Sequence, residues 1–364
     1  MPGPGAKACP RATSSWPRSR SCSVRGMTLR LTASLALGLL PVLVFLCVLV
    51  LLDSYKLVPP RRIVRQLLLG GLAAVVSMAL NEELRAALEI DATVQARYVA
   101  PLVEELLKGL VLVALLARRR LGFLVDAAVS GFAIGAGFAA FENLHYFTVL
   151  RDTSLVLWTV RGFGTAVMHG STLAIMAVAA KSLSDRRGGV SAASVAPGWA
   201  VAVGLHSLFN HFFVSPNASA ALLLVALPAF FTVVFRVGEA RTREWLGTSF
   251  DTDQELLALV VAGRTSESRV GAYFAELKTR FPGTVVVDLL CLLRLHLELS
   301  IRAKGLLLMR KAGFTVPPDP DFNERFAELR HLERLVGPTA HRALAPVLNF
   351  SDRDVWQLHL VAGR

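Results

Sequence analysis

Long apolar runs separated by short polar segments dominate the first two thirds of the chain. A helix needs about 20 mostly apolar residues to cross a bilayer, and seven stretches of the sequence approach that length. We therefore predict an all-α fold, a polytopic membrane helix bundle of about seven transmembrane helices. The predicted spans are residues 31–52, 63–80, 99–117, 122–147, 160–180, 197–214 and 220–237.

The pattern changes beyond the last predicted span. Apolar positions there recur at helical spacing among frequent charged residues, which indicates a helical, soluble C-terminal domain at residues 241–364. We expect this domain on the cytoplasmic side. Helices are predicted within it at residues 253–263, 268–281, 284–312 and 322–336.

Residues 1–26 form a third segment, before the predicted transmembrane domain at 27–240. The segment has five basic residues and no acidic one, is rich in proline and serine, and shows no apolar period. We interpret it as a disordered leader, or as translated sequence upstream of a start at Met27.

Composition supports a membrane protein and weakens other interpretations. Of the 364 residues, 54% are hydrophobic and 18% charged, against about 45–50% and about 25% in soluble domains. The net charge of +12 is typical of nucleic-acid binders, but in membrane proteins Lys and Arg gather in cytoplasmic loops. Here basic clusters follow the odd-numbered spans, so we expect those loops and the tail inside, and no nucleic-acid partner.

Charged residues inside predicted spans require an explanation, because one at the bilayer centre costs about 2.5–3.5 kcal/mol. The third span contains Glu104, Glu105 and Lys108. Glu104 and Lys108 are four residues apart in the favourable acid-first order, which predicts an ion pair on one helix face. Glu105 lies about 100° around the helix, so that pair does not explain it and a functional role is favoured.

The next three spans carry further polar side chains. Phe138 and Glu142 share a face of the fourth span, His169 lies in the fifth, and His206 and Asn210 share a face of the sixth. At 1.5 Å per residue, the polar groups of spans three to six lie about 8–14 Å from the outer ends of their spans. Each histidine alone would more often be structural, but the shared depth indicates one site.

The chemistry of such a site favours an activated water molecule, because the layer holds carboxylates and imidazoles without a serine or cysteine nucleophile. In one version zinc lowers the pKa of a bound water. In the other, no metal is present and a desolvated glutamate takes the proton from water, with His and Asn stabilising the oxyanion. Both versions would hydrolyse an amide bond in the bilayer. The zinc-protease motif H-E-x-x-H is absent from the sequence.

Four short motifs follow one another on successive spans: Glu-Glu-x-x-Lys, Phe-x-x-x-Glu-Asn, an isolated His and His-x-x-x-Asn. In order and placement they resemble the PrsW family of bacterial intramembrane proteases, which is related to the CAAX prenyl endopeptidases. The resemblance covers roughly residues 28–240. It implies cleavage of a membrane-spanning, anti-sigma-factor-like protein in the bacterial inner (cytoplasmic) membrane. The catalytic residues it implies are Glu104, Glu105, Glu142, His169, His206 and Asn210.

The resemblance leaves the cofactor open between zinc and a metal-free, glutamate-type enzyme. If a metal is bound, its expected ligands are Glu105, Glu142, His169 and His206. The expected partners are a membrane-spanning protein substrate and the lipid bilayer.

Two other functions fit parts of the pattern. Buried Glu, His and Lys are also what a proton- or ion-coupled transporter uses, but the sequence shows no internal repeat of the kind found in transporters. A silent scaffold is the weakest alternative, because polar contacts between membrane helices average only about 0.6 kcal/mol.

Overall fold

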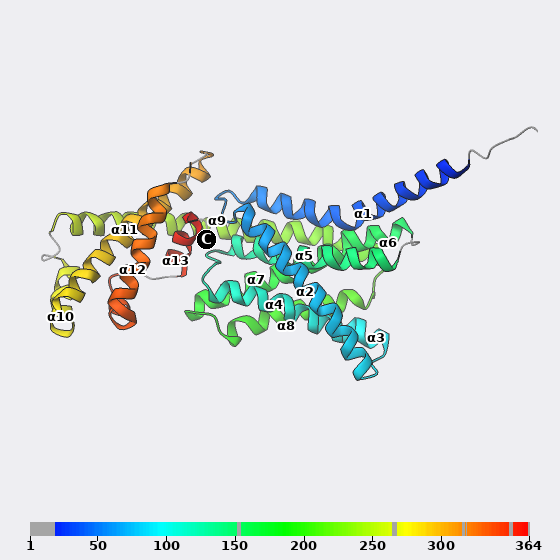
Figure 1. Ribbon diagram of the computed structural model, residues 1–364, viewed down its shortest axis with the longest axis horizontal. Helices are drawn as coiled ribbons and strands as arrows, with labels where there is room; N and C mark the ends of the chain where they lie inside the picture. The colour runs from blue at the N-terminus through cyan, green and yellow to red at the C-terminus, as the bar shows by residue number, and fades with distance from the viewer. Residues whose placement is uncertain are drawn as a thin grey trace, which may run out of the picture.

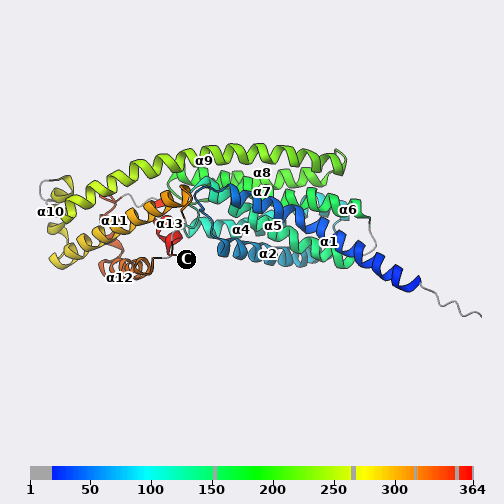
Figure 2. The same ribbon diagram turned by 90° about the horizontal axis from the view of Figure 1, so that it is seen from above.

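The computed structural model describes residues 19–150, 154–263, 268–314, 317, 319–348 and 352–362, and every regular element in these ranges is helical. This confirms the predicted all-α fold. Most of the bundle consists of seven long helices lying side by side (Figures 1 and 2). These are α1 (Ser19–Leu52), α2 (Pro60–Ala87), α4 (Ala100–Ala117), α5 (Leu124–Val149), α7 (Val167–Arg187), α8 (Ala192–Asn210) and α9 (Pro216–Val261).

Six helical segments of the described chain are long and apolar enough to cross a membrane, so the protein is a multi-pass membrane protein. The third predicted span, residues 99–117, corresponds to α4, which is only 18 residues long and contains two glutamates and a lysine. Its three charged residues, and not its hydropathy, keep α4 out of the six segments, although it packs between α2 and α8 within the bundle. The six segments are Arg30–Leu52, Pro60–Ala87, Leu124–Val149, Leu155–Arg187, Ala192–Asn210 and Pro216–Val261.

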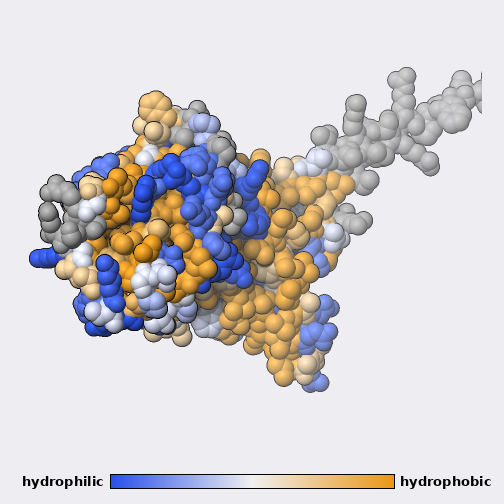
Figure 3. Space-filling view, turned by 60° about the vertical axis from the view of Figure 1, so that its left-hand side comes forward, coloured by the Kyte–Doolittle hydropathy of each residue, from blue (hydrophilic) through white to orange (hydrophobic). Residues whose placement is uncertain are grey.

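The outer faces of these helices are apolar. On α1 and α2, Leu51, Leu68 and Leu72 are each more than half exposed, and the space-filling view shows a broad hydrophobic surface over the bundle (Figure 3). A soluble monomer rarely exposes so large an apolar patch. Lipid is the solvent that suits this surface.

Helix α5 forms the centre of the bundle and packs closely against α2 and α7. The close approach depends on glycine: a Cβ atom added at Gly135 would collide with the backbone carbonyl oxygen of His169 on α7. Gly70 of α2 is similarly placed against the carbonyl of Ile134 on α5. The small residues thus let α5 and α7 pack backbone against backbone, which brings their polar side chains within reach of each other.

Two short π-helical segments lie immediately before two of the helices that carry polar residues, α4 and α7. Segment η1 (Gln95–Val99) links α3 (Ala92–Val94) to α4, and η2 (Arg161–Ala166) links α6 (Leu155–Val160) to α7. Such segments change the rotation of the helix that follows and occur often at functional sites. Apolar periodicity alone did not predict them.

The chain after the bundle forms a second helical body, which sits at one end of the bundle (Figure 1). Its helices are α10 (Arg269–Arg280), α11 (Gly283–Lys311), α12 (Pro320–Ala343) and α13 (Asp352–Val361). The predicted boundary at 240/241 falls inside α9, which continues to Val261 without a break. The tail is therefore built on an extension of a membrane helix.

At the other end of the chain, α1 already begins at Ser19. The last residues of the predicted 1–26 leader are thus helical, whereas residues 1–18 lie outside the described residues.

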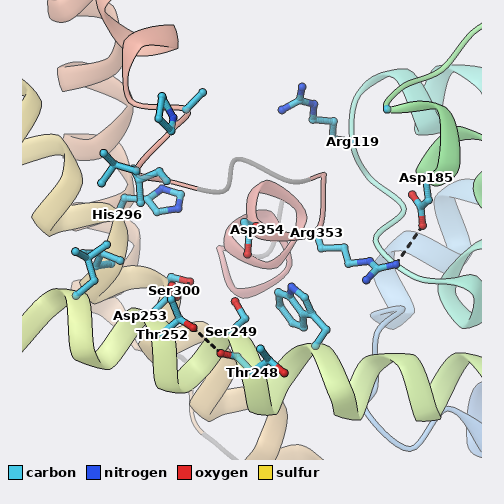
Figure 4. Close-up of a pocket in the computed structure, with 18 of the residues that line it drawn as sticks. Arg119, Asp185, Thr248, Ser249, Thr252, Asp253, His296, Ser300, Arg353 and Asp354 are labelled. Atoms are coloured by element: carbon cyan, nitrogen blue, oxygen red, sulfur yellow. Dashed lines mark hydrogen bonds and ion pairs between the residues drawn. The ribbon is translucent and has the colours of Figure 1, made fainter. Parts of the chain in front are cut away.

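Helix α13 returns to the bundle and joins the two bodies. Trp356 is fully buried and packs against Gly122 and Phe123, just before α5. Beside it, Arg353 forms an ion pair of 3.3 Å with Asp185 at the end of α7 (Figure 4). The tail therefore contacts the end of the same helix that carries His169.

Candidate active site

Side chains from four helices meet in the half of the bundle that lies away from the tail. Helix α4 contributes Glu104, Glu105 and Lys108, α5 contributes Glu142, α7 contributes His169 and Thr172, and α8 contributes His206. Their polar atoms are linked by contacts of 2.6–3.8 Å. Five of the six predicted site residues are thus brought together.

Glu105 is the anchor of this cluster. Its Oε1 atom accepts hydrogen bonds from Lys108 Nζ at 2.6 Å, from Thr172 Oγ1 at 3.1 Å and from His206 Nδ1 at 2.8 Å. The side chain is fully buried. This carboxylate oxygen therefore links α4 to α7 through Thr172 and to α8 through His206. No other atom of the cluster has three hydrogen-bond partners.

The predicted ion pair between Glu104 and Lys108 is wrong, because Lys108 pairs with Glu105, three residues before it. Helix spacing permits either partner, so contacts with other helices decide. The Lys108 ammonium also lies 3.1 Å from Nδ1 of His169 and 4.7 Å from the centre of the Phe138 ring. These contacts draw the lysine towards α5 and α7 and leave Glu104 without a basic partner on its own helix.

Glu104 and Glu105 each have a buried Oε2 atom without a hydrogen-bond partner in the described chain, but Glu105 is held through its other oxygen by Lys108, Thr172 and His206. The Oε2 atom of Glu104 lies 3.8 Å from Nε2 of His206. A buried carboxylate oxygen left without a partner is costly, and it is the arrangement expected of a group that binds a water, a metal ion or a substrate.

His169 has partners at both ring nitrogens. Its Nδ1 faces the Lys108 ammonium and its Nε2 lies 3.1 Å from Oε2 of Glu142. Because an ammonium can only donate, Nδ1 is assigned as the acceptor and Nε2–H as the donor to Glu142. The ring also stands perpendicular to that of His206, with centroids 4.8 Å apart, so the two imidazoles adjoin one space.

Sequence analysis missed Arg161, the first residue of η2. Its Nη2 atom lies 3.4 Å from Oε2 of Glu142 and is buried without a hydrogen-bond partner in the described chain. The guanidinium stacks on Tyr146 at 3.8 Å and donates from Nε to Oδ1 of Asn143. An arginine within a predicted span is itself a signal, because it carries the same insertion cost as a buried glutamate.

Asn210 is the one predicted site residue that lies outside the cluster. Its Nδ2 atom donates to the backbone carbonyl of Ala96 at 2.9 Å, and Ser207 on the same helix donates to the carbonyl of Arg97 at 2.6 Å. Both acceptors belong to η1. In the structure Asn210 therefore joins α8 to the segment that leads into α4.

The donor atoms present fit a zinc ion. One ligand atom from each of Glu104, His169 and His206 lies within 4.8 Å of the others. Catalytic zinc sites commonly use three such ligands and keep a fourth position for water. Hydrogen bonding supports His206 as a ligand, because its Nδ1 is held by Glu105, as is usual for a ligating histidine. Both ring nitrogens of His169 are already engaged, so His169 would ligate a metal only by giving up its contact with Lys108 or with Glu142. Of the other predicted ligands, Glu105 and Glu142 hydrogen-bond the histidines instead.

Together, the fold and the cluster define a multi-pass membrane protein with a buried carboxylate–histidine centre of the kind that activates water. Residues 58–237 match the family model described as the PrsW family intramembrane metalloprotease. Over this part the chain belongs to the PrsW family, and the protein is an intramembrane protease. The match contains the whole cluster and ends before the tail. No curated protein and no solved structure matches the chain significantly.

Proposed function

We propose that Glu104 and His206 form the centre at which water is activated to hydrolyse a peptide bond in a membrane-spanning protein of the anti-sigma-factor type. The observation that carries the proposal is the buried, unpartnered Oε2 atom of Glu104, which lies 3.8 Å from Nε2 of His206. The remaining residues of the cluster hold these two in place.

Glu105 fixes the orientation of His206. By accepting the Nδ1 hydrogen of His206 at 2.8 Å, it leaves the lone pair of Nε2 directed towards Glu104. Lys108 and Thr172 bind the same oxygen of Glu105, so the carboxylate cannot rotate without losing three partners. Glu105 and Lys108 are thus positioning residues in this account.

Two versions of the chemistry use these residues. In the first, Glu104 takes a proton from the attacking water and later returns it to the leaving nitrogen. In the second, Glu104, His206 and, once released from Glu142, His169 would hold zinc, which would supply a Lewis acid that lowers the pKa of the water. Glu142 would then be the carboxylate that takes the proton. The description of the family as a metalloprotease favours the second version.

Arg161 completes the proposed site on the side of Glu142. Its Nη2 atom is a buried donor that makes no hydrogen bond in the described chain, although it lies 3.4 Å from Oε2 of Glu142. Stacking on Tyr146 and the bond to Asn143 fix the direction of the guanidinium. Asn143 is in turn anchored on α1, donating to the carbonyl of Gly38 at 2.7 Å. A fixed, dry donor of this kind suits the oxygen on which negative charge develops during attack on a carbonyl.

The proposed setting is the bacterial inner membrane with the tail in the cytoplasm. Arg118, Arg119 and Arg186 lie at the end of the bundle that adjoins the tail, and basic residues favour the cytoplasmic side. The cluster then lies towards the outer face. A substrate would accordingly be cut near the extracytoplasmic end of its span.

The test is cleavage of single-span substrates with varied extracytoplasmic stubs by the full-length protein in proteoliposomes. Glu104→Gln is expected to abolish cleavage in both versions of the chemistry, whereas the control Glu82→Gln, at an exposed position of α2, leaves it unchanged. Zinc add-back after chelation separates the versions. Cleavage that survives Glu104→Gln, or proton-coupled uptake without any cleavage, would contradict the proposal.

A further inference from the structure

We propose that the cleft between the end of α4 and helix α12 binds a phosphate-bearing anion, supplied either by a phospholipid headgroup or by a free phosphate compound. The cleft has a volume of about 620 Å³, within the range of small-molecule sites. Arg118 and Arg119 line it from the bundle, and Arg330 and Arg334 line it from the tail. It lies outside the segment matched by the protease family, at least on its α12 side.

Four arginines line this cleft, and Glu333 is the one carboxylate among its lining residues. That carboxylate is engaged with Arg330 at 2.9 Å and with His341 at 3.8 Å. No carboxylate of the described chain lies within 4.0 Å of Arg118 or Arg334. Like charges gathered around one cavity repel each other, and an anion between them would relieve that repulsion.

The shape of α12 directs its arginines to this cleft. Arg330 and Arg334 are one turn apart and share a helix face, and the Nε atom of Arg334 donates to the carbonyl of Arg330 at 3.2 Å. This bond leaves the two terminal nitrogens of Arg334 for a ligand. At Gly337, which also lines the cleft, the backbone adopts φ 74° and breaks the helix.

A neighbouring cavity shows that the basic lining is particular to this cleft. The neighbour has a volume of about 700 Å³ and lies between the bundle and α13 (Figure 4). It shares Arg119 with the cleft but also contains Asp185, Asp253 and Asp354. Its second arginine, Arg353, is already paired with Asp185 (Figure 4). That cavity therefore does not select for an anion.

The position of the cleft explains why a lipid is one of the two sources. Ala117, the last residue of α4, lines the cleft together with Arg118, so the cleft opens where a membrane helix ends. Phe326, Leu329 and Leu358 give it an apolar floor. Arginine pairs with phosphate through two parallel hydrogen bonds, and the apolar floor suits the organic part of either ligand.

The test measures binding to the full-length protein in a neutral detergent, without any substrate, so it is independent of the proposed proteolysis. The probes are inorganic pyrophosphate and dihexanoyl-phosphatidylglycerol, with dihexanoyl-phosphatidylcholine as the uncharged control. The double substitution Arg330→Gln/Arg334→Gln is compared with Arg280→Gln/Arg294→Gln, which removes the same charge from exposed ion pairs on α10 and α11.

We expect at least one anionic probe to bind, and the α12 double variant to weaken that binding at least tenfold while the control variant matches the wild type. Binding of phosphatidylglycerol alone would identify a headgroup site, and binding of pyrophosphate alone a site for a free phosphate compound. If the α12 variant does not fold, Arg118→Gln on the opposite wall is expected to show the same loss. Equal binding by wild type and cleft variants, or no binding of either anion, would overturn the proposal.

Discussion

The two adjacent glutamates of α4 should respond differently to the same chemical change. Replacing Glu105 with Gln removes the negative charge to which Lys108 Nζ is bound at 2.6 Å, in a place where both side chains are fully buried. Replacing Glu104 with Gln removes no hydrogen bond at its Oε2 atom. The first change should therefore lower both stability and activity, and the second should lower activity alone.

The size of the effect follows from the surroundings of Lys108. Removing one partner of a buried ion pair costs about 3–5 kcal/mol, because the other charge is left uncompensated. At about 2–4 °C per kcal/mol, Glu105→Gln should reduce the midpoint of thermal unfolding by roughly 10 °C. Neutralising an unpartnered buried carboxylate removes a desolvation cost, so Glu104→Gln should unfold at or above the wild-type temperature.

The assay is thermal unfolding of both purified variants in one detergent, together with cleavage of a single-span substrate. The double variant Glu105→Gln/Lys108→Met removes both charges and should recover much of the lost stability without restoring activity. Equal destabilisation by Glu104→Gln and Glu105→Gln would refute the distinction between the two carboxylates. So would an unchanged unfolding temperature in Glu105→Gln.

Other contacts give further predictions. Gly135→Ala should lower the free energy of unfolding by about 1–3 kcal/mol through overpacking and reduce cleavage, because the new methyl group meets the carbonyl of His169. The control Gly204→Ala, in open space on α8, should be neutral or slightly stabilising in the same thermal unfolding assay. Arg161→Lys, which keeps the charge but loses the fork geometry, should lower kcat more than it raises KM; an unchanged kcat would exclude the proposed role. Burial raises the pKa of Asp53, in the loop after α1, from 3.8 to about 6. The folded state therefore binds the proton more tightly than the unfolded state, and the stability of the fold decreases as pH rises from about 4 to about 6. Asp53→Asn should therefore be more stable than the wild type at pH 7.5, by up to about 3 kcal/mol, and this advantage should disappear near pH 4; a difference independent of pH in thermal unfolding would contradict this.

Apolar periodicity was sufficient to find the helices of the bundle, because lipid imposes one length and one composition on each span. The predicted span at 63–80 became the 28-residue helix α2. The run at 99–117 was also recognised from its apolar residues, and only its three charged side chains keep α4 out of the six segments that length and composition select. The extension of α9 through 240/241 was not predicted, since a helix that leaves the membrane changes its surface pattern without changing its backbone.

The pairing of side chains within the site depended on contacts that a single helix does not specify. Helix spacing predicted Glu104 as the partner of Lys108. Contacts of Lys108 with His169 and Phe138 on other helices instead place its ammonium beside Glu105. Asn210 was predicted to belong to the site because it lies four residues after His206. In the structure it donates to a backbone carbonyl of η1, a segment that apolar periodicity did not predict. The sequence could have identified Arg161, because it is a charge inside an apolar run.

The central claim is that peptide bonds are hydrolysed at the level of Glu104 and His206. Mass spectrometry of the fragments of a single-span substrate, cut by the full-length protein in proteoliposomes, tests it most directly. A site about 8–14 Å below the outer end of the spans corresponds to about two to four extended substrate residues. We predict that the cut bond lies at this depth and that the fragments are absent with Glu104→Gln. A cut outside the apolar segment or near its cytoplasmic end, or the same fragments from Glu104→Gln, would contradict the account.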